Sequence, residues 1–139
     1  MIIRRLTDIN LIPRELVEQV PEMEPNAFYS LLSDLPNQPL QFVEVFLDAS
    51  HEIMGFAWAA IELTSKQIHV NTVSLRKKFQ GDGQVLKEYI EHLKERLKNT
   101  KIKVVTWATD RPAFFEKLGF SRSKEVFLEY HLDKEEADG

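Results

Sequence analysis

The chain of 139 residues contains no cysteine, and this absence excludes disulfide frameworks, thiol nucleophiles and cysteine-ligated zinc together. It also lacks an excess of positive charge, because 18 lysines and arginines face 22 acidic residues, for a net charge of −4. A dedicated nucleic-acid binder usually carries a basic face, so we expect no nucleic-acid partner. No run approaches the ~18 consecutive apolar residues of a membrane span, and the start of the chain lacks a signal-peptide core. We therefore expect a cytoplasmic protein with no membrane partner.

The composition is that of a folded domain. Apolar residues make up 43% of the chain and charged residues 29%, which excludes the low apolar content of a disordered chain. The length suits one domain of the usual ~100–200 residues. We predict a single domain over residues 1–132, followed by an acidic tail over residues 133–139 that has no large apolar residue and is disordered.

The spacing of apolar residues predicts six strands and four helices in the order β-α-α-β-β-β-α-β-α-β. Strands that follow one another and then alternate with helices indicate an α/β (α+β) fold, with a mixed sheet that has helices packed on its faces. The strands are expected at residues 2–6, 42–47, 53–63, 67–75, 101–107 and 125–132, and the helices at residues 13–20, 25–35, 86–97 and 110–118.

A glycine-containing loop, Gln80-Gly81-Asp82-Gly83-Gln84-Val85, joins the third strand of the central run to the long helix. Glycines allow a sharp turn and a close approach to a ligand, and the unpaired amides at a helix start suit a phosphate group. A plain turn capped by Asp82 explains the same residues equally well. The lysine and the serine or threonine that directly follow the glycines of a mononucleotide-binding loop are missing here. The spacing of the glycines is also not that of a dinucleotide-binding site.

Two segments together resemble the GNAT acyltransferase superfamily. The first is the Gln80-x-x-Gly83 loop that opens the long helix, and the second is Phe114-Phe115-Glu116-Lys117-Leu118-Gly119-Phe120, which is similar to the superfamily's Tyr-Glu-Lys-Leu-Gly-Phe signature. The order of elements from Ile2 to Leu132 is also similar. The resemblance implies a strongly twisted mixed sheet, splayed open between its fourth and fifth strands.

The same resemblance implies that acetyl-coenzyme A is the co-substrate and that it lies in the split of the sheet. Its pyrophosphate would bind the loop amides, and its pantetheine arm would pair with the backbone near Val73 and Leu75, as an added strand does. The implied cofactor-binding residues are Val73, Leu75, Gln80, Gly81, Asp82, Gly83, Gln84, Val85 and Phe115.

Three residues depart from the pattern of the superfamily. Val85 stands where glycine or alanine is preferred, and Asp82 adds a negative charge to an anion site. Phe115 stands where many members carry a tyrosine that protonates the departing thiolate. The basic run 76–78 either offsets the charge of Asp82 or is a solvated loop.

Transfer to an amine requires a group that takes the amine proton. The candidates are His69 and Asn71 on the central strand and Glu62 at the end of the strand before. His69 and Asn71 are two residues apart and should share one face of the sheet. Histidine has the side-chain pKa closest to neutrality, which suits a base, although a half-buried strand histidine bonded to a neighbour explains His69 as well. Glu62 also reads as a surface charge at the end of a hairpin.

The remaining candidates carry less chemistry. His51, His92 and His131 lie in a turn, on the polar side of the long helix and near the tail, and no pair has metal-ligand spacing, so we predict no metal site. Trp58 and Trp107 either line an acceptor pocket or belong to the core.

The predicted function is transfer of an acetyl group from acetyl-coenzyme A to an amine of a small molecule or a peptide. The alternative is a GNAT-like module that binds acyl-coenzyme A or a partner protein without turnover. A third hypothesis, a nucleic-acid modifier or binder, rests only on the basic run 76–78. Phe28, Tyr29 and Leu32 favour an apolar or aromatic amine if they line the acceptor pocket rather than the core. The oligomeric state, with a dimer as one option, stays open.

Overall fold

A computed structural model describes residues 1–6, 12–19, 40–81, 83–126 and 128–132 of the chain. These residues form two compact units, over residues 1–108 and 109–139, and each unit is described by itself. The prediction of a single domain over residues 1–132 therefore stays a prediction. The predicted second helix at residues 25–35 and the tail at residues 133–139 lie outside the described residues, as do Phe28, Tyr29, Leu32 and Asp82.

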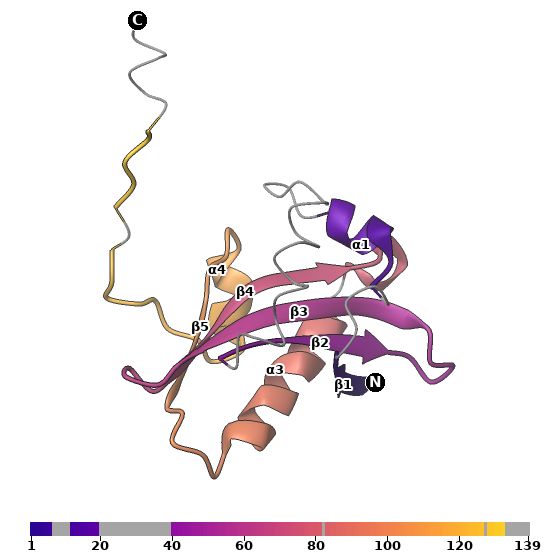
Figure 1. Ribbon diagram of the computed structural model, residues 1–139, viewed down its shortest axis with the longest axis horizontal. Helices are drawn as coiled ribbons and strands as arrows, with labels where there is room; N and C mark the ends of the chain where they lie inside the picture. Colours follow the sequence, from indigo (N-terminus) through magenta and orange to yellow (C-terminus); the bar gives the residue numbers. More distant parts are fainter. Residues whose placement is uncertain (7–11, 20–39, 82, 127, 133–139) are drawn as a thin grey trace, which may run out of the picture. The chain divides into compact units, whose positions relative to one another are not determined.

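The first unit is built on a five-stranded mixed sheet with the strand order β1-β2-β3-β4-β5 (Figure 1). The first four strands are antiparallel, and β5 runs parallel to β4. The predictions of a mixed sheet and of its first five strands are thus confirmed. The strands are β1 (Ile2–Arg5), β2 (Gln41–Leu47), β3 (Ile53–Glu62), β4 (Gln67–Leu75) and β5 (Val104–Trp107).

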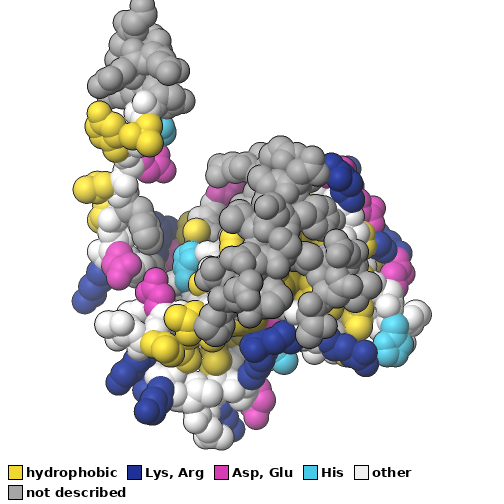
Figure 2. All heavy atoms as spheres, in the orientation of Figure 1, with side chains coloured by type: hydrophobic (Ala, Val, Ile, Leu, Met, Phe, Trp, Pro, Cys, Tyr) yellow, Lys and Arg dark blue, Asp and Glu magenta, His cyan; other side chains and the backbone are white. Residues whose placement is uncertain are grey.

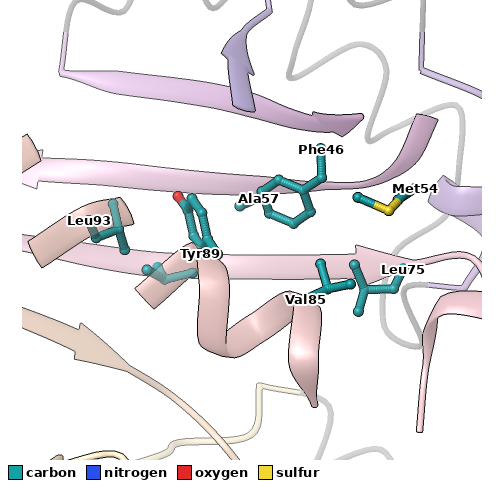
Figure 3. Packing of buried hydrophobic residues seen from close by; sticks show 8 residues of the cluster. Phe46, Met54, Ala57, Leu75, Val85, Tyr89 and Leu93 are labelled. Atoms are coloured by element: carbon teal, nitrogen blue, oxygen red, sulfur yellow. The ribbon is translucent and has the colours of Figure 1, made fainter. Parts of the chain in front are cut away.

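Helices cover both faces of this sheet. The short helix α1 (Arg14–Glu18) buries Leu16 and Val17 against residues of β2 and β3 on one face. The helix α3 (Gln84–Leu97) packs on the opposite face, with its apolar stripe turned toward the strands (Figures 1 and 3). A 3-10 turn, η3 (Lys77–Phe79), links β4 to the loop before α3. Among the described residues no helix is long and apolar enough to cross a membrane.

The cluster under α3 holds the sheet and the helix together. In Figure 3 the ring of Tyr89 projects from α3 toward Ala57 and Phe46, and its centroid lies 4.8 Å from that of Phe46. Burial of such apolar area stabilises the fold by roughly 25 cal/mol per Å² removed from water. The buried members of this cluster are Phe46, Met54, Ala57, Val70, Leu75, Val85, Tyr89 and Leu93.

A buried carboxylate, which no sequence pattern indicated, lies beside this cluster. Glu44 on β2 is only 2% exposed. Arg96 of α3 donates to it from 2.5 Å, the Tyr89 hydroxyl lies 3.3 Å from its other oxygen, and His92 Nε2 lies 3.7 Å away. A buried charge is tolerated only when it is paired and hydrogen-bonded, so α3 supplies the partners that β2 requires.

The second unit contains the helix α4 (Pro112–Lys117), which confirms the predicted short helix. Pro112 stands in its first turn, and Gly119, just past its end, has a left-handed φ of 99°. The Phe120 amide donates to the carbonyl of Phe115 at 3.1 Å, and the two rings are 5.3 Å apart. Phe120 therefore packs back onto the last turn of α4.

The predicted final strand at residues 125–132 is wrong for the described residues of that segment, which form no strand. Alternation alone cannot form a strand, because a strand also needs a neighbouring backbone with which to pair its amides and carbonyls. The apolar side chains of the alternation remain 78–92% exposed; they are Val126, Leu128, Tyr130 and Leu132.

Candidate functional site

The strand β4 changes its surroundings halfway along its length. Its residues 67–70 pair with β3 on one side and with residues 104–107 of β5 on the other. Beyond Val70 the pairing with β5 ends, because β5 stops at Trp107 while β4 continues to Leu75. From Asn71 onward, therefore, β4 pairs with β3 and with no other described strand. This opening confirms the split that was predicted between the fourth and fifth strands.

A β-bulge marks the point of the change. Trp58 on β3 pairs with Thr72 and Ala59 pairs with Val70, which leaves Asn71 as an extra residue on β4. Bulges bend a strand and re-aim its side chains, and they are common next to active sites. The prediction that His69 and Asn71 share a face relied on regular alternation, and the bulge removes that premise. Asn71 itself is exposed.

The second half of β4 turns main-chain groups toward the open side. The amide of Arg76 donates to Met54 on β3 at 2.9 Å, so the carbonyl of Leu75, in the same peptide unit, faces away from β3. By the alternation of a strand, the amide and carbonyl of Val73 face the same way. Among the described residues of the first unit, the main chain of Val73 and the amide of Leu75 therefore have no strand partner on this side, which suits an extended ligand held by main-chain hydrogen bonds.

The glycine loop is held close to this strand edge. The Gln80 side-chain amide donates to the carbonyl of Leu75 at 2.7 Å and to Oε1 of Gln19 at 3.0 Å. Gly81 and Gly83 have φ angles of 127° and 75°, which L side chains rarely adopt. The carbonyl of Gly83 accepts the first helical hydrogen bond, from Lys87, at 2.9 Å. The loop therefore leads directly into the start of α3 at Gln84, where the first helical amides have no partner within the helix.

Val85, one of the departures from the pattern, has a place in the core. Its side chain is 9% exposed and packs in the cluster under α3. Valine instead of glycine or alanine at this position therefore adds apolar packing between α3 and the sheet, because the side chain is buried in the cluster.

The basic run after β4 is largely neutralised by acidic neighbours. Arg76 pairs with Glu15 at 2.7 Å and with Glu52 at 3.0 Å, and Lys78 pairs with Glu52 at 2.7 Å. Figure 2 shows cationic and anionic side chains interspersed over the described part of the visible face. Arg76 and Lys78 therefore fix η3 to its neighbours, and the sequence signal for the third hypothesis is an ion-pair network.

His69 lies on the paired half of β4. Its sheet neighbours are Ala60 on β3 and Thr106 on β5. The ring atom Nδ1 is 2.7 Å from the Thr106 hydroxyl oxygen, and the side chain is half-buried. Ile68 and Val70, on either side of His69, both lie in clusters under α3, so His69 faces the opposite side of the sheet.

Glu62 is hydrogen-bonded at the end of the hairpin. Gln67 donates to its carboxylate at 2.8 Å and Ser65 at 2.9 Å. These two hydrogen bonds lower the pKa of the exposed Glu62 carboxyl, and the hydrogen bond from Gln67 has the larger effect. A carboxylate held in its charged form is a poor proton acceptor near neutral pH, which favours the interpretation of Glu62 as a surface charge.

The two tryptophans do not share a pocket within the first unit. Trp58 packs with the cluster beneath α1, and its indole nitrogen donates to Gln41 at 3.1 Å. Trp107 packs on the opposite face with the cluster under α3. Both side chains thus belong to the packing of the sheet, as one of the two interpretations had it.

Phe115 belongs to the second unit. It is buried, and its ring lies 5.3 Å from the rings of both Phe114 and Phe120. A phenylalanine side chain has no hydroxyl group, so Phe115 cannot act as the acid that the tyrosine at this position supplies in many members of the superfamily. Among the described residues no cluster of acidic, histidine and cysteine side chains could hold a metal ion.

Sequence reasoning missed Thr106. No motif includes it, and its importance comes from the parallel register that sets it beside His69, 37 residues away in the chain. Its one sequence signal is weak: Thr106 is the single polar residue in the apolar run 104–107.

Comparison with solved structures identifies the fold. No family model matches the sequence, and no curated protein matches it either. Glucosamine-6-phosphate N-acetyltransferase from Arabidopsis thaliana is similar at 20% identity, over 92% of this chain and 96% of that one, with a TM-score of 0.65. A predicted acetyltransferase from Clostridium acetobutylicum, solved with acetyl-CoA, is similar at 15% identity over 95% and 96%, with a TM-score of 0.69.

A third structure agrees with these two. The aminoglycoside 6'-N-acetyltransferase AAC(6')-IG from Acinetobacter haemolyticus is 13% identical over 96% of this chain and all of that one, with a TM-score of 0.69. Chains this different in sequence share the arrangement of their elements. The chain therefore has the GNAT acetyltransferase fold, which confirms the fold that the loop and the Leu-Gly-Phe segment predicted.

Proposed function

We propose that this GNAT-fold chain is an acetyl-coenzyme A-dependent N-acetyltransferase that acts on an amine. The observation that carries the proposal is the second half of β4, whose main-chain edge pairs with no described strand on one side and which leads through η3 into the glycine loop and the start of α3. These features together suit a long ligand with an amide-containing arm and a pyrophosphate. The similar structures are those of proteins named as acetyltransferases, which supports the same chemistry.

In this proposal the pantetheine arm pairs with the main chain of Val73 and with the amide of Leu75. The carbonyl of Leu75 already accepts from Gln80, so Gln80 holds the loop at the end of the arm. The pyrophosphate binds the amides of residues 81–85. At Gly81 the structure leaves open space, since nothing lies within 4 Å of where a Cβ would be.

In the reaction the acetyl group moves directly from the sulfur of coenzyme A to the nitrogen of the amine. A neutral amine attacks the thioester carbonyl carbon, a carbon–nitrogen bond forms, and the carbon–sulfur bond breaks to release the thiolate. The amine proton passes to His69. The side chain of His69 lies on the face of the sheet opposite the α3 cluster. Because Phe115 has no hydroxyl group, no phenol at that position protonates the coenzyme A thiolate as it leaves.

The acceptor is a small molecule or a peptide with a free amine. The names of two similar structures supply a first panel, an aminoglycoside and glucosamine 6-phosphate. An aromatic amine and a peptide amine complete it, because the residues that would favour an apolar acceptor lie outside the described part of the chain. A cytoplasmic location belongs to this proposal as well.

The test has a binding arm and a turnover arm. Calorimetry should show coenzyme A binding to the wild type, and Gly83→Val should abolish or strongly weaken it, because a β-branched residue blocks the loop and strains its left-handed backbone. Ala49→Val, in the exposed turn between β2 and β3, is the matched control and should bind normally. Circular dichroism shows whether each variant is folded.

Thiol release from acetyl-coenzyme A with the amine panel is the second arm. Release that depends on an amine supports the proposal. Equal coenzyme A binding by folded Gly83→Val would place the cofactor elsewhere. Binding by the wild type without turnover on any amine would support the non-catalytic module instead.

A further inference from the structure

We propose that Thr106 is the positioning residue of His69: its hydroxyl fixes the imidazole so that Nε2 is the nitrogen that receives the amine proton. The inference rests on the proposed function and extends it to a residue outside every motif of the sequence. It is drawn from the register of β4 against β5 and from a single short side-chain contact.

The register fixes which side chains flank the ring. His69 lies between Ala60 on β3 and Thr106 on β5, and Ala60 offers no polar atom on its side chain. The side-chain hydrogen bond of the ring therefore comes from β5, at 2.7 Å between Nδ1 and the hydroxyl oxygen. Both residues are half-buried, so water competes less for this bond than it would at an exposed site.

The hydroxyl is itself held by the backbone of β4. Thr106 Oγ1 lies 3.5 Å from the carbonyl oxygen of Ile68, and the hydroxyl donates in that direction. The donor and acceptor at the Nδ1 contact depend on the tautomer of the ring, and the proposal assigns the one in which the hydroxyl proton points to Ile68: the Thr106 oxygen then accepts and Nδ1 carries the hydrogen. In the neutral ring the lone pair is consequently on Nε2.

The arrangement serves both protonation states of the ring. When Nε2 takes a proton from the amine, Nδ1 keeps its own hydrogen and its bond to Thr106, so no rearrangement accompanies the transfer. A partner that fixes the tautomer is the role that an aspartate plays in the serine-protease triad, and here a neutral hydroxyl has it.

Within the part of the chain that the structure describes, the ring has few charged neighbours. From β3 the carboxylate of Glu62 acts on His69 through its charge, and it is itself held by Gln67 and Ser65. The strand β5 brings no titratable side chain between Val104 and Trp107. The orientation of the ring therefore depends on the Thr106 hydroxyl and not on an ion pair.

The test compares two substitutions of nearly the same shape. Thr106→Val keeps the branched side chain and removes the hydroxyl, whereas Thr106→Ser keeps the hydroxyl and removes a methyl group. Nitrogen-15 NMR of the histidines reports which ring nitrogen of His69 carries the proton. Steady-state kinetics reports kcat and the KM for acetyl-coenzyme A.

In the wild type and Thr106→Ser we expect the proton on Nδ1. In Thr106→Val we expect it to move in part to Nε2, with kcat lowered about 10–100-fold, the range seen when the partner that orients a histidine is lost. The KM for acetyl-coenzyme A should hardly change, and Thr106→Ser should retain most of the rate.

Three results would overturn the inference: a wild-type ring with its proton on Nε2, a Thr106→Val variant with unchanged tautomer and rate, or a Thr106→Ser variant as slow as Thr106→Val. A wild type that turns over no amine contradicts the proposed function alone, because the NMR measurement still decides whether Thr106 fixes the ring.

Discussion

The two faces of the sheet treat polar side chains in opposite ways. On the α3 face, Glu44 is buried and is surrounded by Arg96, Tyr89 and His92 from one helix. On the other face, His69 is half-buried and forms a side-chain hydrogen bond with the uncharged hydroxyl of Thr106. The first arrangement neutralises a charge, and the second leaves a ring nitrogen available for chemistry.

This difference suggests that stability and activity are divided between the faces. A buried ion pair that loses one partner leaves an uncompensated charge, which destabilises the fold strongly. A half-exposed histidine can be removed with little loss of packing. Substitutions on the α3 face should therefore change unfolding, and substitutions at His69 should change turnover.

The largest expected effect is on the rate. His69→Ala should lower the chemical step by ~10²–10⁴, the range for the loss of a positioned base, and leave coenzyme A affinity unchanged. His92→Ala, the matched histidine on the α3 face, should keep the rate per folded molecule. Single-turnover kinetics and calorimetry measure the two quantities. A folded His69→Ala variant with the wild-type rate would show that His69 is not the base and that the proton leaves through water.

The next effect is on stability. Arg96→Ala removes the cation that pairs with buried Glu44 and should lower the free energy of unfolding by about 3–5 kcal/mol. Lys94→Ala breaks an exposed pair with Glu91 on the same helix and should cost less than about 1 kcal/mol. Urea unfolding measures both. Equal losses in the two variants would contradict the division between a neutralised core charge and a surface pair.

Substitution of Gly55 tests the close contact between β3 and the second half of β4. A Cβ at this position would lie 2.3 Å from the backbone oxygen of Ser74 and 2.6 Å from Leu75 Cδ2, so strand β4 must shift. Gly55→Ala should lower the free energy of unfolding by about 1–3 kcal/mol, the usual cost of overpacking. It should also weaken coenzyme A binding, since Leu75 lies on the proposed arm site. An unchanged coenzyme A affinity in calorimetry would show that this part of β4 does not bind the cofactor.

The smallest effect concerns Tyr89 and appears at alkaline pH. Burial, and then the charge of Glu44, raise the pKa of the Tyr89 hydroxyl well above its usual value. The folded state keeps this proton where the unfolded chain loses it near pH ~10, so the wild type should lose stability as the pH rises above that value.

Tyr89→Phe should lose this part of the alkaline dependence, at a cost of about 1 kcal/mol at neutral pH for the hydrogen bond to Glu44. Urea unfolding of both proteins from pH 8 upward gives the difference. Parallel curves for the two proteins would show that the hydroxyl titrates normally.

Much of the fold was predictable because it is local. The spacing of apolar residues predicted β4 with the bounds that the structure has, Gln67–Leu75, and the helix predicted at residues 110–118 contains α4. The segment at residues 125–132 shows the limit, because its alternation is as regular as that of β4 and yet its described residues form no strand.

The candidate site divides in the same way. The glycine loop was predictable, since glycine is the residue type that readily permits the positive φ angles found at Gly81 and Gly83. The bulge at Asn71 and the contact between His69 and Thr106 were not, because both depend on how strands pair.

The sequence by itself determined the order of the elements, the loop that begins α3 and the resemblance that named the fold, because each depends on residue types at short spacing. The tertiary structure alone decided where β5 stops beside β4, which face His69 occupies and which groups neutralise Glu44. These features join residues that are 37 to 52 positions apart in the chain. Contacts at such separation are set by strand register and helix packing, which local patterns do not specify.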